Sequence, residues 1–272
     1  MIERKTKLIT ACFFQNLLEY SEISHFITTR MDGYSHKPYN SLNLGFHVGD
    51  DSNTVVENRK RLANSMDILL ENFTTSQQIH TDNIEIIFEN RRGCGANDYK
   101  TAVAAADAMV TSVQNICLMV LVADCVPIIL FDAKKKIIGV VHAGWKGTVL
   151  RIAQKMVTLL KEKFDCSAND LLVGIGPSIG PCCYIVDRET IFRTNSVLKE
   201  ENEIVFHKKH DGKGYFDLWT TNKLQLKKMG IPEKNIEIAG MCTFCNNALF
   251  YSHRKEGGTT GRFGVGIMLK SK

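Results

Sequence analysis

Three neighbouring apolar segments, 116–122, 126–131 and 137–141, most limit what this chain can fold into. They are rich in β-branched and aliphatic residues without polar alternation, a pattern typical of strands that are buried on both faces. The last two segments are separated by the polar turn residues 132–136. We therefore predict central strands in sheets that are covered on both sides.

The remaining patterns interleave further strands and helices. We predict strands at 23–29, 84–89, 171–175, 236–239 and 263–269, and helices at 54–72 (capped by Asn53 or Thr54), 148–164 and 218–229. Mixed element order with antiparallel hairpins favours an α+β fold over a doubly wound sheet. A chain of 272 residues suits one large core, and no linker or repeat divides it, so we expect a single domain over 1–272.

Composition excludes several classes of protein. A chain that is 44% hydrophobic and 23% charged is not disordered, collagen-like or a coiled coil. The net charge of +5 is too mild for a nucleic-acid-binding surface, and the longest apolar run is interrupted by Asp124 and too short to cross a bilayer. Nine cysteines, an odd number, favour a reducing compartment. We predict a cytoplasmic protein without nucleic-acid or membrane partners.

The sharpest chemical signal is Cys125 followed by His142 across the predicted hairpin. A turn centred between Ala133 and Lys134 would place the two directly opposite each other, with Cβ atoms about 4.5–5.5 Å apart, whereas a turn one residue later shifts the pairing by two. His80 is the best candidate for a third ligand. His80, Cys125 and His142 would give a nitrogen–sulfur–nitrogen set with one coordination position left for water, as in catalytic zinc sites.

Other interpretations of these residues stay open. Cys125 could be a metal-free nucleophile with His142 as its base, or both could simply be core residues. Segment 174–180 is glycine-rich and could line an anion or ribose pocket, or form a tight turn. For the adjacent Cys182 and Cys183 we expect a structural role. The C-x-x-C pair at 242–245 lacks a second pair at zinc-ribbon spacing, so we do not expect it to bind metal.

Several short motifs in order identify a resemblance. They are Asp32-Gly33 with Asn43-Leu44-Gly45, Val48-Gly49-Asp50-Asp51 and Asn58-Arg59; Gln78-Ile79-His80; Ala123-Asp124-Cys125-Val126-Pro127-Ile128; His142-Ala143-Gly144-Trp145-Lys146-Gly147; Gly174-Ile175-Gly176-Pro177; and Thr260-Gly261-Arg262. With them the chain resembles the bacterial YfiH/YlmD family, also called the laccase-domain or purine nucleoside phosphorylase family, whose animal relative is FAMIN. The match extends from about residue 20 to the C-terminus.

The resemblance implies a layered α/β/β/α fold, seen also in a bacterial toxin deamidase, and a zinc ion held by His80, Cys125 and His142. It also implies phosphorolysis of adenosine, inosine, guanosine and methylthioadenosine to base and ribose-1-phosphate, and deamination of adenosine to inosine. An older label for the family is copper-dependent polyphenol oxidase. Copper could replace zinc at a thiolate site, but the chain lacks the ten or so ligands of a multicopper centre. Where many members have Ser-Tyr-Arg, this chain has Ser252-His253-Arg254.

Our first hypothesis is therefore a zinc enzyme that acts on purine nucleosides and phosphate, as a monomer or small homo-oligomer. Asp124 is expected to move protons. Candidate contacts to phosphate or ribose are Arg30, Asn43, Arg59, Lys146, Arg254 and Arg262. The alternatives are a metal-free cysteine hydrolase or amidase that uses Cys125 and His142, and a non-catalytic sensor of purine or phosphate.

Overall fold

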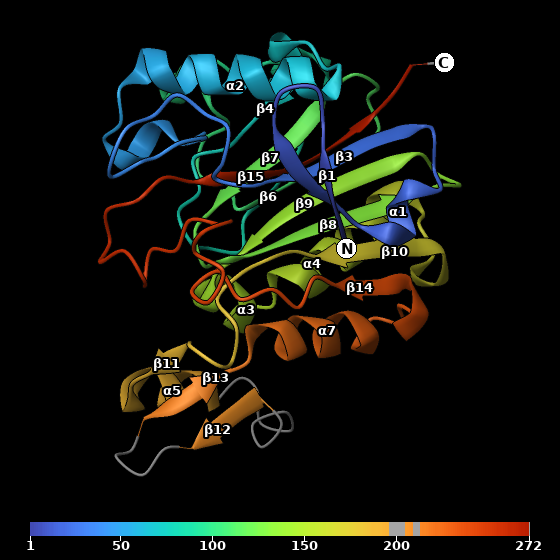
Figure 1. Ribbon diagram of the computed structural model, residues 1–272. Coiled ribbons are helices and arrows are strands. Elements are labelled where there is room, and N and C mark those ends of the chain that lie inside the picture. Colours follow the sequence, from blue (N-terminus) through green and yellow to red (C-terminus); the bar gives the residue numbers. More distant parts are fainter. Residues whose placement is uncertain (196–204, 209–212, 272) are drawn as a thin grey trace.

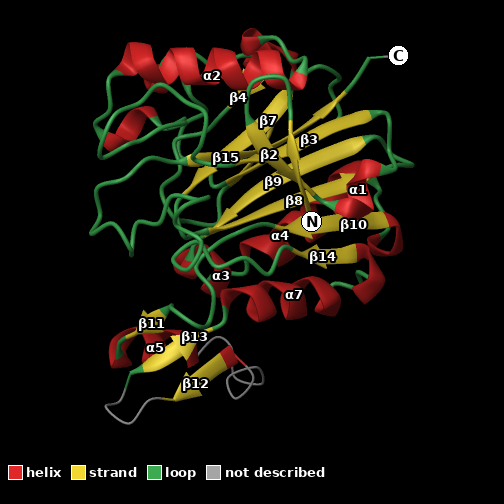
Figure 2. Ribbon diagram, in the orientation of Figure 1, coloured by secondary structure: helices red, strands yellow, loops and turns green. Residues whose placement is uncertain are grey.

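Two six-stranded mixed sheets pack face to face with helices on both outer sides (Figure 1). The computed structural model describes residues 1–195, 205–208 and 213–271. Helix α2 lies over one outer face, and α3, α4 and α7 lie over the other (Figure 2). The α+β class and the α/β/β/α layering expected from the resemblance are confirmed.

The first sheet has the strand order β1-β2-β3-β15-β7-β4. Its strands are β1 (Ile2–Lys5), β2 (Thr10–Phe13), β3 (Ile23–Thr28), β15 (Phe263–Leu269), β7 (Cys117–Val122) and β4 (Phe73–Thr74), and its covering helix is α2 (Ser52–Met66). The second sheet has the order β14-β10-β8-β9-β6-β5. Its strands are β14 (Ile236–Ile238), β10 (Leu171–Ile175), β8 (Val126–Asp132), β9 (Ile137–Ala143), β6 (Ala108–Thr111) and β5 (Ile84–Ile86).

The outer helices of the second sheet are α3 (Trp145–Val149), α4 (Ile152–Phe164) and α7 (Leu218–Lys228), and α1 (Gln15–Leu18) lies beside β10. A small third sheet has the order β11-β13-β12 (Ile185–Val186, Gly214–Phe216 and Phe206–Lys208) and is accompanied by α5 (Arg188–Asn195). Short 3-10 turns occur at Phe46–Val48, Leu70–Asn72, Glu89–Arg91, Tyr99–Thr101, Ala168–Asp170 and Glu233–Asn235. Within the described residues, no helix is long and apolar enough to cross a membrane.

The predicted double-sided burial is confirmed. Every residue of β7, β8, β9 and β15 is buried. The reason is that the core has three layers: one between the sheets, one under α4 and α7, and one under α2. Strands β7 and β8 belong to different sheets, so the three residues between them cross from one sheet to the other. This crossing carries Asp124 and Cys125.

The hairpin register differs from the one that placed Cys125 opposite His142. Pro127 is the partner of His142, and the turn is centred one residue later than assumed. The reason is a four-residue turn after Asp132, whose carboxylate accepts hydrogen bonds from the amides of Lys134 and Lys135, both at 2.9 Å. Cys125 therefore lies just beyond the paired strands.

Two predicted helices have different bounds. Helix α2 begins after Asp51, whose side chain accepts from the Thr54 amide at 2.7 Å, and ends at Asp67, which has a left-handed φ of 53°. The predicted helix 148–164 is divided between α3 and α4, with Arg151 at φ 61° between them. The interruption has a tertiary cause, because Gln225 of α7 donates to the Thr148 carbonyl at 2.8 Å.

Candidate metal centre and cavity

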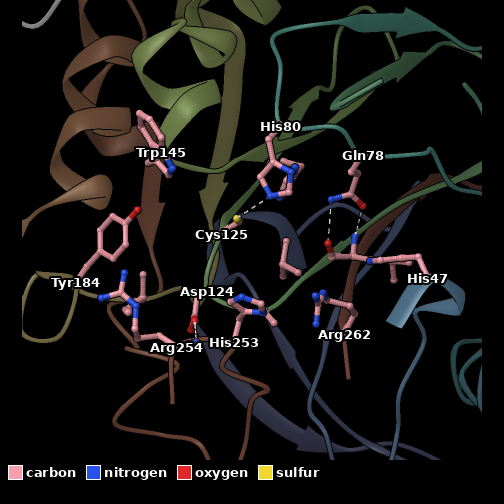
Figure 3. Close-up of a pocket in the computed structure, with 15 residues that line it drawn as sticks. His47, Gln78, His80, Asp124, Cys125, Trp145, Tyr184, His253, Arg254 and Arg262 are labelled. Carbon is pink, nitrogen blue, oxygen red and sulfur yellow. Dashed lines mark hydrogen bonds between the residues drawn. The ribbon is translucent and has the colours of Figure 1, made fainter. Parts of the chain in front are cut away.

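A cavity of about 410 Å³ opens where the chain crosses from β7 to β8 (Figure 3). This volume is within the usual range for small-molecule pockets, about 300–1,000 Å³. The crossing is sharp: Asp124 has a φ of 82°. The residues that line the cavity are His47, Gln78, His80, Leu121, Val122, Ala123, Asp124, Cys125, His142, Trp145, Ile179, Tyr184, His253, Arg254 and Arg262.

His80, Cys125 and His142 meet at this cavity, as the sequence predicted. Their ligand atoms all lie within 4.8 Å of one another, and His80 Nε2 is 3.9 Å from Cys125 Sγ. Close approach depends on Gly144, because a Cβ atom there would lie 3.0 Å from Cys125 Sγ and 3.2 Å from the His80 ring. The three residues therefore form one site even though the hairpin pairing that suggested it was wrong.

Asp107 holds the His142 side chain and the His80 backbone, and the sequence analysis did not single it out. Its Oδ1 accepts from His142 Nδ1 at 2.8 Å and from the His80 amide at 3.0 Å. Its Oδ2 accepts from the amide and the hydroxyl of Thr81 at 2.7 and 2.9 Å. A carboxylate on one imidazole nitrogen is the usual support of a metal-binding histidine, since it leaves the other nitrogen for the metal. The signal available in the sequence was an aspartate directly before the short apolar segment 108–110, and its burial appears only in the structure.

The electrostatics favour the charged forms of Cys125 and His142. Burial by itself raises the pKa of the Cys125 thiol, but the charge of His142 and hydrogen bonds from His142 and His80 lower that pKa to about 6. Burial lowers the pKa of His142, but Cys125 and Asp107 raise it to about 9. Cys125 is thus a thiolate near neutral pH, which is the form that binds metal or acts as a nucleophile.

The trio fits a zinc ion. Thiolate and imidazole are donors that zinc takes, and three protein ligands are the number found in catalytic zinc sites. In the part of the chain that the structure describes, one other group of potential ligands occurs: Cys182, Cys183, Cys242 and Cys245. This cluster suggests a second metal site and corrects our expectation that the C-x-x-C pair has no partner. The partner pair is Cys182-Cys183, which lies about sixty residues upstream and is joined to it only by the fold.

Two of the six predicted substrate contacts line the cavity. Arg254 and Arg262 are on either side of His253 in Figure 3. The Arg254 guanidinium lies over the Tyr184 ring, 5.2 Å from its centroid, and donates to the Ile185 carbonyl at 2.9 Å. The cavity therefore has two cationic groups among aromatic and histidine side chains.

The two other predicted arginines lie elsewhere. Arg59 is 2% exposed and donates to the carbonyl oxygens of Leu44 and Ala96, so it ties loops together inside the protein. Arg30 pairs with Glu256 at 2.9 Å and lies over the Tyr251 ring. Neither is among the residues that line the cavity, although we expected both to contact substrate.

Asn43 and Lys146 are not in the lining either. The side-chain carbonyl of Asn43 accepts from the Arg262 amide at 2.8 Å, so Asn43 acts on the cavity by positioning Arg262. Lys146 is exposed next to Trp145, whose ring is the part of this motif that faces the cavity.

Asp124 lines the cavity, but its carboxylate is already engaged. Oδ1 accepts from Thr243 Oγ1 and Oδ2 accepts from the Arg254 amide, both at 2.6 Å. These bonds fasten the Arg254 loop to the β7–β8 crossing. The observed role of Asp124 is therefore to hold the backbone of Arg254, whereas we expected it to move protons.

The glycine-rich segment 174–180 is a tight turn that packs closely. The amide of Gly176 donates to the Pro127 carbonyl at 2.8 Å, and that of Gly180 donates to Cys242 Sγ at 3.2 Å. Because these amides have partners inside the protein, the turn interpretation is the one the structure favours over an anion pocket.

Two further cavity residues were missed or only noted. Gln78 exchanges two hydrogen bonds of 2.9 Å with the backbone of Leu121 and thereby holds the end of β7 (Figure 3). Burial, together with the nearby Arg262 and Arg59 charges, lowers the pKa of His47 to about 4, so its imidazole is neutral at pH 7. Gln78 belonged to the motif around His80, whereas nothing local to His47 indicated its place.

Known proteins are similar to this chain over most of its length. The family model described as multi-copper polyphenol oxidoreductase laccase matches residues 24–270. The purine nucleoside phosphorylase YlmD of Geobacillus stearothermophilus is 40% identical over 236 residues, 87% of this chain and 86% of that one. The chain belongs to the YfiH/YlmD family.

Members of this family carry more than one activity in their names. The adenosine deaminase RL5, from an unknown prokaryotic organism, is 33% identical over 248 residues, which are 91% of this chain and 94% of that one. The crystal structure of the Geobacillus stearothermophilus YlmD superposes with a TM-score of 0.93 at 36% identity and covers 98% of both chains. The resemblance identified from the ordered motifs is therefore confirmed.

Proposed function

We propose that this protein is a zinc-dependent purine nucleoside phosphorylase that also deaminates adenosine. The observation that supports this most is the His80, Cys125 and His142 trio at a cavity that also presents two arginines and two aromatic rings. The names of the family members cited above support the substrate class. The proposed substrates are purine nucleosides, methylthioadenosine among them, and phosphate.

His80, Cys125 and His142 would hold the zinc ion, with Asp107 fixing the Nδ1 tautomer of His142. A zinc ion bound there supplies Lewis acidity and activates water near neutral pH. Gly144 leaves room for the Cys125 and His80 side chains to lie close together, and Asp107 holds the backbone of His80.

Arg254 and Arg262 are the proposed phosphate-binding residues. In phosphorolysis a phosphate oxygen forms a bond to C1′ of the ribose while the C1′–N9 bond breaks, and the leaving purine takes up a proton. Paired cationic groups stabilise the phosphate and the charge that develops during transfer. The side chains of Asp124 and Asn43 accept hydrogen bonds from the backbone amides of Arg254 and Arg262, at 2.6 and 2.8 Å. The backbone that carries each guanidinium group is therefore held in place.

Trp145 and Tyr184 offer the flat surfaces on which a purine can stack, and both line the cavity (Figure 3). His253 faces the same space from between Asp124 and Arg262. It is the group that we propose to give a proton to the leaving base, because a histidine side chain can act as a general acid.

The test is incubation of the zinc-loaded protein with adenosine, with and without phosphate, resolved by chromatography. Adenine and ribose-1-phosphate that appear only with phosphate establish phosphorolysis, and inosine in either case establishes deamination. Arg254→Ala and Arg262→Ala should raise the KM for phosphate about 10- to 100-fold, the loss of one charge-assisted hydrogen bond. Arg4→Ala, on an exposed strand, is the matched control. Survival of adenosine, inosine and methylthioadenosine would refute the proposal.

A metal-free cysteine hydrolase is the second candidate, because one observation favours it. Cys125, His142 and Asp107 form a nucleophile–base–carboxylate chain. Burial alone would raise the pKa of Cys125, but His142 outweighs this effect and lowers the pKa to about 6. Chelator-treated protein separates the two: the zinc enzyme loses turnover on chelation and regains it with zinc, whereas a cysteine hydrolase keeps turnover and loses it on alkylation of Cys125.

A further inference from the structure

Four cysteines from two distant loops meet beside the cavity. Cys182 and Cys183 follow β10, and Cys242 and Cys245 follow β14. All four Sγ atoms lie within 4.8 Å of one another, with Cys245 Sγ 3.8 Å from Cys182 Sγ and 3.4 Å from Cys183 Sγ. The fold thus brings two short cysteine motifs together at one point.

The sulfur separations fit a tetrahedral metal site. Four sulfurs each about 2.3 Å from one zinc ion lie about 3.8 Å apart at the corners of a tetrahedron. The observed 3.4 and 3.8 Å are close to this edge and much longer than the roughly 2.05 Å of a disulfide bond. Cys245 is also near two thiols at once, which one disulfide bond cannot satisfy.

Backbone hydrogen bonding points the same way. The Gly180 amide donates to Cys242 Sγ at 3.2 Å, within the buried part of the cluster. A thiolate accepts such a bond better than a thiol does, and hydrogen bonds to ligand atoms are the usual outer support of a metal site. Glycine is needed here, because a Cβ atom at residue 180 would lie 2.7 Å from the Trp219 ring.

We propose that Cys182, Cys183, Cys242 and Cys245 bind one zinc ion as a closed tetrathiolate site, separate from the site formed by His80, Cys125 and His142. Four soft thiolates select zinc over hard cations, and a site with four protein ligands leaves no position for substrate. The role is therefore structural. This inference does not depend on which reaction the cavity performs.

The zinc ion would fasten two loops that shape the cavity. The loops are also joined by backbone bonds, from Thr243 to Ser178 at 3.0 Å and from Ser178 to Met241 at 3.3 Å. Tyr184, which lines the cavity, directly follows Cys183. Because metal binding by a preformed site adds to folding free energy, we expect zinc to stabilise this wall.

A second contact links the cysteine cluster to Asp124. Thr243 lies between Cys242 and Cys245 and donates its hydroxyl to Asp124 Oδ1 at 2.6 Å. Asp124 in turn holds the Arg254 amide. Loss of the zinc should therefore loosen the wall that carries Tyr184 and Arg254 and leave the opposite wall in place.

Metal analysis tests the proposal without measuring activity. In a full-length His80→Ala/His142→Ala background, purified under reducing conditions and supplied with zinc, we expect one zinc per chain. Adding Cys182→Ser and Cys245→Ser should remove it, whereas Cys94→Ser, a partly exposed cysteine outside the cluster, should leave it. Cobalt(II) in the same background should give the intense visible and sulfur-to-cobalt bands of a tetrahedral tetrathiolate site.

Two further measurements test the proposal without the serine variants, in case these variants do not fold. In the His80→Ala/His142→Ala background, zinc should protect the four cysteines from alkylation, and chelation should expose them, as mapped by mass spectrometry. Chelation should also change the tryptophan fluorescence, since Trp219 donates to Ser178 Oγ at 2.5 Å and its ring packs on Gly180.

Three outcomes would overturn the proposal. The first is a background variant that binds neither zinc nor cobalt and whose four thiols are alkylated equally with and without metal. The second is metal retained after Cys182→Ser/Cys245→Ser. The third is a disulfide from Cys245 to Cys182 or Cys183 in protein purified under reducing conditions, which would indicate a redox pair. None of these bears on nucleoside turnover, so the two proposals fail separately.

Discussion

Replacement of Asp107 by asparagine tests whether the proposed catalytic metal site is oriented by one buried carboxylate. The two oxygens of Asp107 accept from His142 Nδ1, the His80 amide, and the amide and hydroxyl of Thr81, over distances of 2.7 to 3.0 Å. Asparagine has the same shape but one acceptor oxygen. The NH₂ group of asparagine must therefore face either His142 and the His80 amide or the donors of Thr81.

Either orientation of the introduced amide group has a cost. With the amide oxygen toward His142, the NH₂ group faces the donors of Thr81, and a buried donor left without a partner costs about 1–3 kcal/mol of folding stability. With the NH₂ group toward His142, the imidazole must accept at Nδ1 and carry its proton on Nε2, the nitrogen needed for metal. Loss of such outer support typically weakens metal binding 10- to 100-fold, about 1.4–2.7 kcal/mol.

The assay is the zinc dissociation constant at the His80, Cys125 and His142 site, measured by competition with a chromophoric chelator at pH 7 in the Cys182→Ser/Cys245→Ser background. Asp82→Asn is the matched control, since Asp82 is nearby in sequence but pairs with Lys155 at the surface. We expect Asp107→Asn to weaken zinc binding at least tenfold and Asp82→Asn to change it less than twofold. Equal affinity of Asp107→Asn and wild type would refute the orienting role.

Three further predictions concern stability. Gly174→Ala should lower the free energy of unfolding by about 1–3 kcal/mol in urea titrations, because its Cβ would lie 2.4 Å from the buried Phe14 ring. Burial lowers the pKa of His25 to about 4, so between pH 6.5 and pH 4 the unfolded chain takes up a proton at His25 more readily than the folded protein does. As the pH falls over this range, the free energy of unfolding of wild type should decrease by about 3 kcal/mol relative to that of His25→Gln. Arg59→Met should lower the melting temperature without changing the KM for nucleosides, because its donors bind buried backbone carbonyls.

Each of these has its own control or contrary result. Gly139 is a matched strand glycine whose Cβ would make only ordinary contacts at 3.5 Å, so Gly139→Ala should be far milder than Gly174→Ala. An identical pH dependence in wild type and His25→Gln would show that His25 does not contribute. A raised KM at unchanged stability in Arg59→Met would restore that arginine as a substrate contact.

Local sequence patterns determined much of the fold. The apolar runs at β7, β8 and β9 predicted strands covered on both sides, because a strand buried on both faces cannot contain polar alternation. The same patterns misplaced the ends of α2 and joined α3 to α4. Those boundaries depend on a capping side chain, Asp51, and on a tertiary hydrogen bond from Gln225, which periodicity does not record.

The sequence by itself also predicted that His80, Cys125 and His142 meet at one site, from residue type, hairpin spacing and the ordered motifs, and the structure brings the three together. Only the tertiary structure decided how they meet, because the hairpin turn is centred one residue later than the spacing suggested. The three residues are brought together by the crossing between the two sheets and by Asp107. Only the tertiary structure showed that Cys182 and Cys183 lie beside Cys242 and Cys245, and that Arg30 and Arg59 lie outside the cavity lining. The physical reason is that a side chain's chemistry is local, whereas its partners come from strands and loops far apart in the chain.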